Sequence, residues 1–254
     1  MKRLLFLTTI VILFAASAQA GLVAWYEFEG NADDSIGSNH GILMDGASII
    51  TDSQRGQVLS LDGDNDYMSL LECTVTTTEF TIAAWALMEG PGGGEKTLNI
   101  IFSQRDDNVG DNRCAISLLP ENSISTQMAA AGIRSSDGTV QGIYTPRKTY
   151  GQWHHYAMTV NSDYFSFYID GEIIDTVENL QLGDYVTSID YITIGRARFN
   201  GRNTGFFNGF IDDSRFYDYA LSQKEITELI PEPSTILMLG LGIPILAGFL
   251  RRKK

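Results

Sequence analysis

Residues 153–177 read WHHYAMTVNSDYFSFYIDGEIIDTV and decide the fold. Aromatic, β-branched and other apolar residues dominate the runs 153–160, 164–169 and 173–177. Asp170-Gly171 separates the last two runs, and an Asp-Gly pair is a strong hairpin signal because both positions tolerate positive φ. The stretch therefore predicts antiparallel strands joined by tight turns.

Similar short runs continue on both sides, separated by turns rich in Gly, Asp and Asn. We expect further strands at residues 22–28, 58–61, 67–70, 80–85, 98–103, 191–194 and 207–217. The turn at 62–66 joins two of them as a hairpin, and Ser222 to Glu225 has the capping-box spacing of a short helix. With no repeat of 20–50 residues, the pattern predicts one all-β domain at 21–230, a two-sheet antiparallel jelly-roll sandwich.

The first 20 residues have the three parts of a signal peptide. A basic start, Lys2-Arg3, precedes an apolar run at 4–16, and Ala18-Gln19-Ala20 supplies small residues for signal peptidase. We expect a signal helix at 1–20 that is cleaved after Ala20. A retained anchor is the alternative, although the run is short for a membrane span.

The C-terminal segment, residues 231–254, has three successive parts. They are the triplet Pro231-Glu232-Pro233, an apolar stretch at 234–250, and the basic terminus Arg251, Arg252, Lys253 and Lys254. The apolar stretch reaches about 25 Å as a helix, just enough for a bilayer core. The cations favour a cytoplasmic C-terminus, which places the domain on the outer side. The sequence predicts a transmembrane helix here.

This tail resembles the PEP-CTERM sorting signal of Gram-negative bacteria, with an ordinary tail anchor as the alternative. The resemblance implies recognition by an exosortase and delivery to the envelope. We expect a domain tethered through 234–250 before processing, and then placed at the cell surface or in the extracellular matrix. Whether the tail is cleaved or retained stays open.

The net charge of the domain limits the classes of ligand that it can bind. Residues 21–230 contain 12 Lys/Arg and 30 Asp/Glu, a net charge of −18. This charge disfavours nucleic acid and anionic membrane surfaces, whereas divalent cations and neutral sugars remain compatible. Cys73 and Cys114 are the two cysteines, and an oxidising compartment would permit a disulfide between them. Two buried thiols are the alternative.

Several segments, in order, resemble the laminin-G-like, concanavalin-A-like jelly rolls of bacterial surface proteins. They are residues 22–30, 34–41, 61–67, 80–85, 151–157 with 168–171, 210–217 and 220–226. The resemblance covers 22–229 and implies the sandwich fold. It also implies sugar binding, protein adhesion or a structural role, so the function must be argued from a site.

Two aspartate pairs are the candidate calcium ligands. Asp33 and Asp34 follow the first strand, Asp212 and Asp213 lie on the last strand, and first and last strands are neighbours in such jelly rolls. The four carboxylates could converge on Ca²⁺, or cap turns and accept backbone hydrogen bonds. Asp62, Asp64 and Asp66 start like an EF-hand, but the loop rule fails at its sixth and twelfth positions, so we expect a hairpin turn.

The remaining candidates favour binding over catalysis. His154 and His155 point to opposite faces of a strand and cannot share a metal ion. Glu27 and Glu29 share a face of the expected first strand, but a solvated or turn-bonding role fits them better than glycoside hydrolysis. Tyr144, Arg147 and Tyr150 could reach a ligand, while Trp25, Trp85 and Trp153 fit the core.

We therefore expect a non-enzymatic surface or matrix module that binds carbohydrate or protein, with Ca²⁺ as a candidate cofactor. A structural matrix component without a discrete ligand is the alternative. A polysaccharide hydrolase is the least favoured reading.

Overall fold

The computed structural model of the chain describes residues 21–72, 75, 77–93, 98–105, 115–119, 121–122, 129–134, 140–145, 150–178, 180, 191–199 and 202–230. The signal peptide, the C-terminal tail, Cys73, Cys114 and Arg147 lie outside these ranges, so the predictions for them stay predictions. Over the described residues, no helix combines the length and apolarity needed to cross a membrane.

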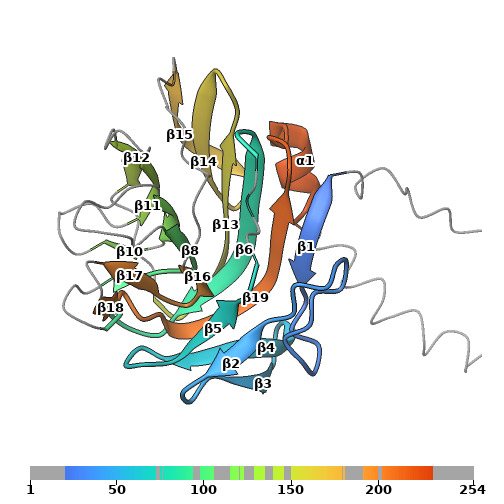
Figure 1. The fold of residues 1–254 in the computed structure, drawn as a ribbon, viewed down its shortest axis with the longest axis vertical. Coiled ribbons are helices and arrows are strands. Elements are labelled where there is room, and N and C mark those ends of the chain that lie inside the picture. Colours follow the sequence, from blue (N-terminus) through green and yellow to red (C-terminus); the bar gives the residue numbers. More distant parts are fainter. Residues whose placement is uncertain are drawn as a thin grey trace, which may run out of the picture.

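The described strands form two large antiparallel sheets that face each other (Figure 1). The eight-stranded sheet has the order β15-β14-β13-β6-β19-β4-β3, with β1 also paired to β19. Its strands are β1 Leu22–Tyr26, β3 Ser48–Asp52, β4 Gly56–Asp62, β6 Phe80–Met88, β13 Trp153–Val160, β14 Tyr164–Ile169, β15 Glu172–Glu178 and β19 Asn208–Tyr217. The predicted neighbourhood of first and last strands is confirmed.

The seven-stranded sheet has the order β12-β11-β9-β8-β16-β5-β2. Its strands are β2 Ile42–Met44, β5 Tyr67–Leu70, β8 Phe102–Arg105, β9 Ala115–Leu119, β11 Ala129–Arg134, β12 Val140–Thr145 and β16 Tyr191–Ile194. Two small pairs complete the described strands: β7 Leu98–Asn99 with β10 Glu121–Asn122, and β17 Ala197–Phe199 with β18 Arg202–Thr204.

The main core fills the space between the sheets because each strand turns alternate residues inward. On β6, Ile82, Ala84 and Ala86 face this core and are almost fully buried. Phe102 of β8 meets Phe216 of β19 across the sandwich, with ring centroids 4.9 Å apart. The predicted two-sheet sandwich is confirmed.

A second cluster lies on the outer face of the eight-stranded sheet, where the helix α1, Gln223–Glu228, packs. Ser222 caps this helix with the expected capping box to Glu225, and Ile226 is buried against the sheet. Both faces of this sheet are therefore covered near α1.

Three local expectations meet different outcomes. Asp170 and Gly171 have φ of 51° and 77°, which confirms the hairpin between β14 and β15. The segment at 62–66 is a turn, but the hairpin prediction is wrong because β4 and β5 belong to different sheets. The first strand ends at Tyr26 and not at residue 28, because Phe28 has a φ of 56° that leaves the extended conformation.

Candidate ligand-binding faces

The three tryptophans do not lie in the core between the sheets. Trp25 packs against the second hydrophobic cluster, whereas for Trp85 and Trp153 the prediction of core packing is wrong. Trp85 lies between Ala84 and Ala86, which face the core, so its side chain is on the outer face of the sheet. Its neighbours on the adjacent strands are His155 of β13 and Asp212 of β19. Trp153 and Trp25 share its outer face by the same alternation. This face thus carries three partly buried indoles.

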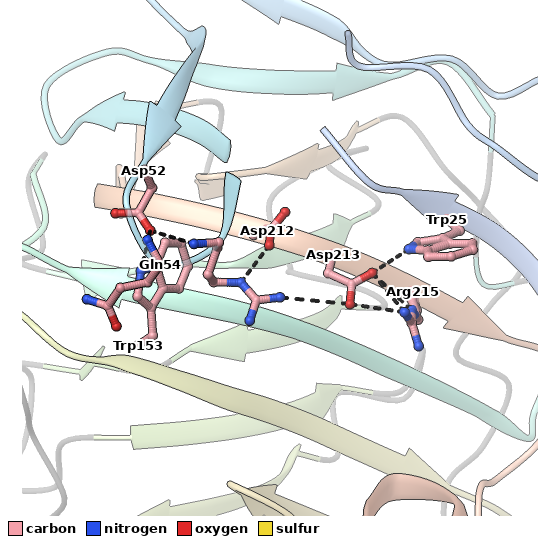
Figure 2. A network of polar contacts seen from close by, with 8 residues as sticks. Trp25, Asp52, Gln54, Trp153, Asp212, Asp213 and Arg215 are labelled. Carbon is pink, nitrogen blue, oxygen red and sulfur yellow. Dashed lines mark hydrogen bonds and ion pairs between the residues drawn. The ribbon is translucent and has the colours of Figure 1, made fainter. Parts of the chain in front are cut away.

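Arg55 covers two of these indoles. Its guanidinium carbon lies 4.3 Å from the Trp85 ring centroid and 5.5 Å from that of Trp153. Its Nε donates a hydrogen bond of 2.6 Å to Asp212 (Figure 2). Asp52 fixes the turn that carries this arginine by accepting from the backbone N–H groups of Gln54 and Arg55, and from the Trp153 indole at 3.3 Å.

Asp213 organises the next part of this face, at a bulge in β19 where its φ is 53°. Figure 2 shows it between Trp25, whose Nε1 donates to it at 2.5 Å, and Arg215, which donates two hydrogen bonds. Each arginine thus has a carboxylate partner. Burial raises the pKa of Asp212 to about 6, against the opposing effect of Arg55. These ion pairs and hydrogen bonds link the β3–β4 turn, β1 and β19 to one another.

The four candidate calcium ligands have other partners, and Arg55 lies within 4 Å of both Asp212 and Asp213. One oxygen of Asp34 accepts the backbone N–H groups of Trp25 and Ile36, and exposed Asp33 lies 3.7 Å from His40. The expected convergence with the aspartates of β19 is not observed. Within the described ranges, no three His, Cys, Asp or Glu side chains form a group that could hold a metal ion.

The histidines point to opposite faces of β13 as predicted, and the 62–66 carboxylates bond within turns although the segment is no hairpin. His155 is 2% exposed and packs edge-on against Trp85, whereas His154 points the other way and hydrogen-bonds Asp170 at 2.7 Å. Asp62 accepts the backbone N–H groups of residues 64 and 65, and buried Asp66 accepts those of Gly46 and Asp62. These carboxylates stabilise turns.

Glu27 and Glu29 follow the end of β1, so the prediction that they share a strand face is wrong. Glu27 accepts a hydrogen bond from the Ser35 hydroxyl, and Glu29 approaches the turn at Gly56. Both carboxylates support loops. This arrangement fits the turn-bonding role.

The outer face of the seven-stranded sheet is built differently. Strand register places a row of small residues across six of its strands, and we call it the small-residue row: Ser69, Thr193, Ser103, Ser117, Gly132 and Gly142. Neighbouring strands lie about 4.8 Å apart, so the row extends over roughly 24 Å. The row is covered at Ser103 and Thr193, which are 1% and 4% exposed, and is partly exposed at Gly132 and Gly142.

Tyr144 lies at one end of this row. Atoms of its ring lie 3.1–3.2 Å from where a Cβ of Gly142 would be, so the ring covers the glycine, and the residue is 43% exposed. Tyr150, also proposed from sequence, bridges Met88 of the other sheet. The structure therefore does not place the two tyrosines on one sheet.

Two arginine–tyrosine stacks flank the other end of the row. The guanidinium of Arg196 lies 3.6 Å from the ring centroid of Tyr67, and that of Arg198 lies 4.0 Å from that of Tyr191. Sequence reasoning missed these stacks, since Arg196-x-Arg198 after an expected strand is only a faint signal.

The two antiparallel sheets define a jelly-roll sandwich. The sequence model of the concanavalin A-like lectin/glucanases superfamily (Laminin_G_3) matches residues 62–227, well over half of the chain. The chain belongs to this superfamily. A PEP-CTERM protein-sorting motif matches residues 229–254, which marks an exported protein of the Gram-negative envelope that exosortase processes. No curated protein matches the chain.

Solved structures share the fold at low sequence identity. Domain 4 of AbnA, a GH43 extracellular arabinanase from Geobacillus stearothermophilus, in complex with arabinotriose, is 20% identical with a TM-score of 0.66, over 84% of this chain and 99% of that one. The binding domain of Paraclostridial Mosquitocidal Protein 1 is 19% identical with a TM-score of 0.59, over 82% and 51%. The receptor binding domain of botulinum neurotoxin D is 13% identical with a TM-score of 0.60, over 84% and 53%.

Proposed function

We propose that the protein is an exported, non-enzymatic module that binds a polysaccharide on the outer face of the seven-stranded sheet. The observation that carries the proposal is the Tyr144 ring, which covers Gly142 and stays 43% exposed at the end of the small-residue row. An aromatic ring held along a sheet offers an apolar surface against which a pyranose can stack.

Location supports this function. The sorting motif at 229–254 delivers the domain to the envelope, where polysaccharide is abundant. In this proposal the domain spans 21–230, the segment 234–250 tethers it before exosortase acts, and the domain then resides at the surface or in the matrix. The structure of the AbnA domain with arabinotriose supports a sugar as ligand class for a relative in fold.

The Tyr144→Ala variant is expected to weaken polysaccharide binding at least tenfold, about 1.4 kcal/mol, because the stacking surface is removed. The measurement is a glycan array followed by titration calorimetry, with the full chain in detergent micelles. Ile173→Ala is the matched control, since Ile173 is 50% exposed at the edge of the other sheet. Equal binding by both variants would contradict the proposed site. Absence of binding to every glycan would favour the structural matrix component instead.

Calcium assistance stays a separate prediction. It requires Asp212 and Asp213 to exchange their arginine and indole partners for a cation shared with Asp33 and Asp34. A bound ion stabilises only the folded state, so Ca²⁺ should raise the melting temperature of the full chain and a chelator should lower it. Identical melting curves under the two conditions would remove calcium from the proposal.

A further inference from the structure

Cations with described side chains lie on both sides of the sandwich. On the side of the eight-stranded sheet, Arg55, Arg215 and Lys224 each lie within 4 Å of a carboxylate. On the side of the seven-stranded sheet, Arg196 precedes β17, and Arg198 and Arg202 lie on β17 and β18.

Arg196 provides the most specific observation. The residue is 5% exposed, its guanidinium stacks on Tyr67, and its Nε and Nη1 have no hydrogen-bond partner. No carboxylate pairs with it among the described residues, in contrast to Arg55 on the other sheet. A buried N–H group without an acceptor destabilises the folded state, and the effect is larger when the group is charged.

The backbone of Arg196 is also hydrogen-bonded to a residue of the small-residue row. The hydroxyl of Thr193 donates a hydrogen bond of 2.7 Å to the backbone carbonyl of Arg196. Ser103, which pairs with Thr193 in the row, is 1% exposed, and its Oγ has no partner. Both side chains leave polar atoms without a hydrogen-bond partner, Arg196 over β5 and Ser103 on β8.

We infer that the polysaccharide bound by the seven-stranded sheet is acidic and that Arg196 binds its carboxylate or sulfate groups. This inference rests on the proposed function and refines its ligand class. Arginine is the residue best suited to such planar anions, and an acidic group would satisfy the donors of Arg196 that the protein leaves unpaired. The overall charge of −18 favours neutral sugars, whereas Arg196 supplies a local cation without a paired carboxylate among the described residues.

The test compares hexagalacturonate, a heparin hexasaccharide and a methyl-esterified hexagalacturonate, titrated into the full chain in detergent micelles at low and moderate salt. The wild type should bind at least one acidic probe ten times more tightly than the ester, less so at higher salt. Arg196→Gln should lose that preference and Arg196→Lys should retain part of it. Lys224→Gln is the control, because it removes one exposed cation on the opposite side.

The outcomes separate the two proposals. Equal affinity for acidic and esterified probes, or an acidic preference unchanged in Arg196→Gln, overturns the inference while the polysaccharide site stands. Loss of the preference in both Lys224→Gln and Arg196→Gln also overturns it, because net charge alone would then explain the result. Failure of all glycans, neutral ones included, overturns the proposed function itself. Melting curves of each variant show whether it is folded.

Discussion

Replacing Gly209 by alanine is expected to lower the free energy of unfolding by more than about 3 kcal/mol. Gly209 lies in β19, between Met88 of β6 and Leu61 of β4, with a φ of 139°. A Cβ there would lie 2.1 Å from the carbonyl oxygen of Leu87. Backbone atoms of a central strand cannot move aside cheaply, so the methyl group and the positive φ both destabilise the fold.

Urea denaturation of the full chain, followed by tryptophan fluorescence, measures this effect. Gly132→Ala is the matched control, because its Cβ would meet nothing closer than the Gln141 carbonyl oxygen at 3.7 Å, and we expect a change below about 1 kcal/mol. If both variants unfold at the same urea concentration as the wild type, the result contradicts the close contact between the backbone of Gly209 and the carbonyl oxygen of Leu87.

The second large effect is a loss of folding stability at acidic pH, caused by the buried side chain of His155. Burial lowers its pKa to about 3, and the positive charge of Arg215 acts in the same direction. The folded state therefore holds this imidazole neutral, while the unfolded chain protonates it near pH 6.5. Its contribution to stability is complete above pH 6.5 and is lost progressively as the pH falls toward 3.

Between pH 7.5 and 4, wild type should lose about 3 kcal/mol more stability than His155→Leu. Chemical denaturation at a series of pH values gives this difference. Asp212 acts with the opposite sign, because its raised pKa adds stability as the pH falls through about 6, but it is present in both proteins. His40→Leu, at an exposed position, is the control. Parallel pH profiles for wild type and His155→Leu would contradict the burial of His155.

The parts predicted well from sequence are those that local chemistry determines. Asp170-Gly171 specifies its hairpin because the two residues themselves tolerate the required φ values. Ser222 and Glu225 likewise specify the start of α1. In contrast, the turn residues at 62–66 predict a turn but not that the chain changes sheets there, since sheet membership depends on distant pairings.

The positions of the tryptophans and the arginine–tyrosine stacks could be established only from the tertiary structure. Alternation shows that Trp85 and Ala84 face opposite sides, but both sides of the eight-stranded sheet are covered, so hydrophobicity could not tell which side is the core. The strand at 129–134 is rich in Ala and Gly, which have weak strand preference. The stack of Arg196 on Tyr67 joins segments far apart in sequence.

The pairing of β1 with β19 has a consequence for export. Trp25 and Asp213 are separated by 188 positions, yet they share a hydrogen bond in one sheet. A chain that crosses the membrane amino end first presents β1 long before its partner emerges, so this sheet closes only after nearly the whole domain has passed. Such distant pairing slows folding. An exported chain with this pairing would therefore complete this sheet only after its last strand has crossed the membrane.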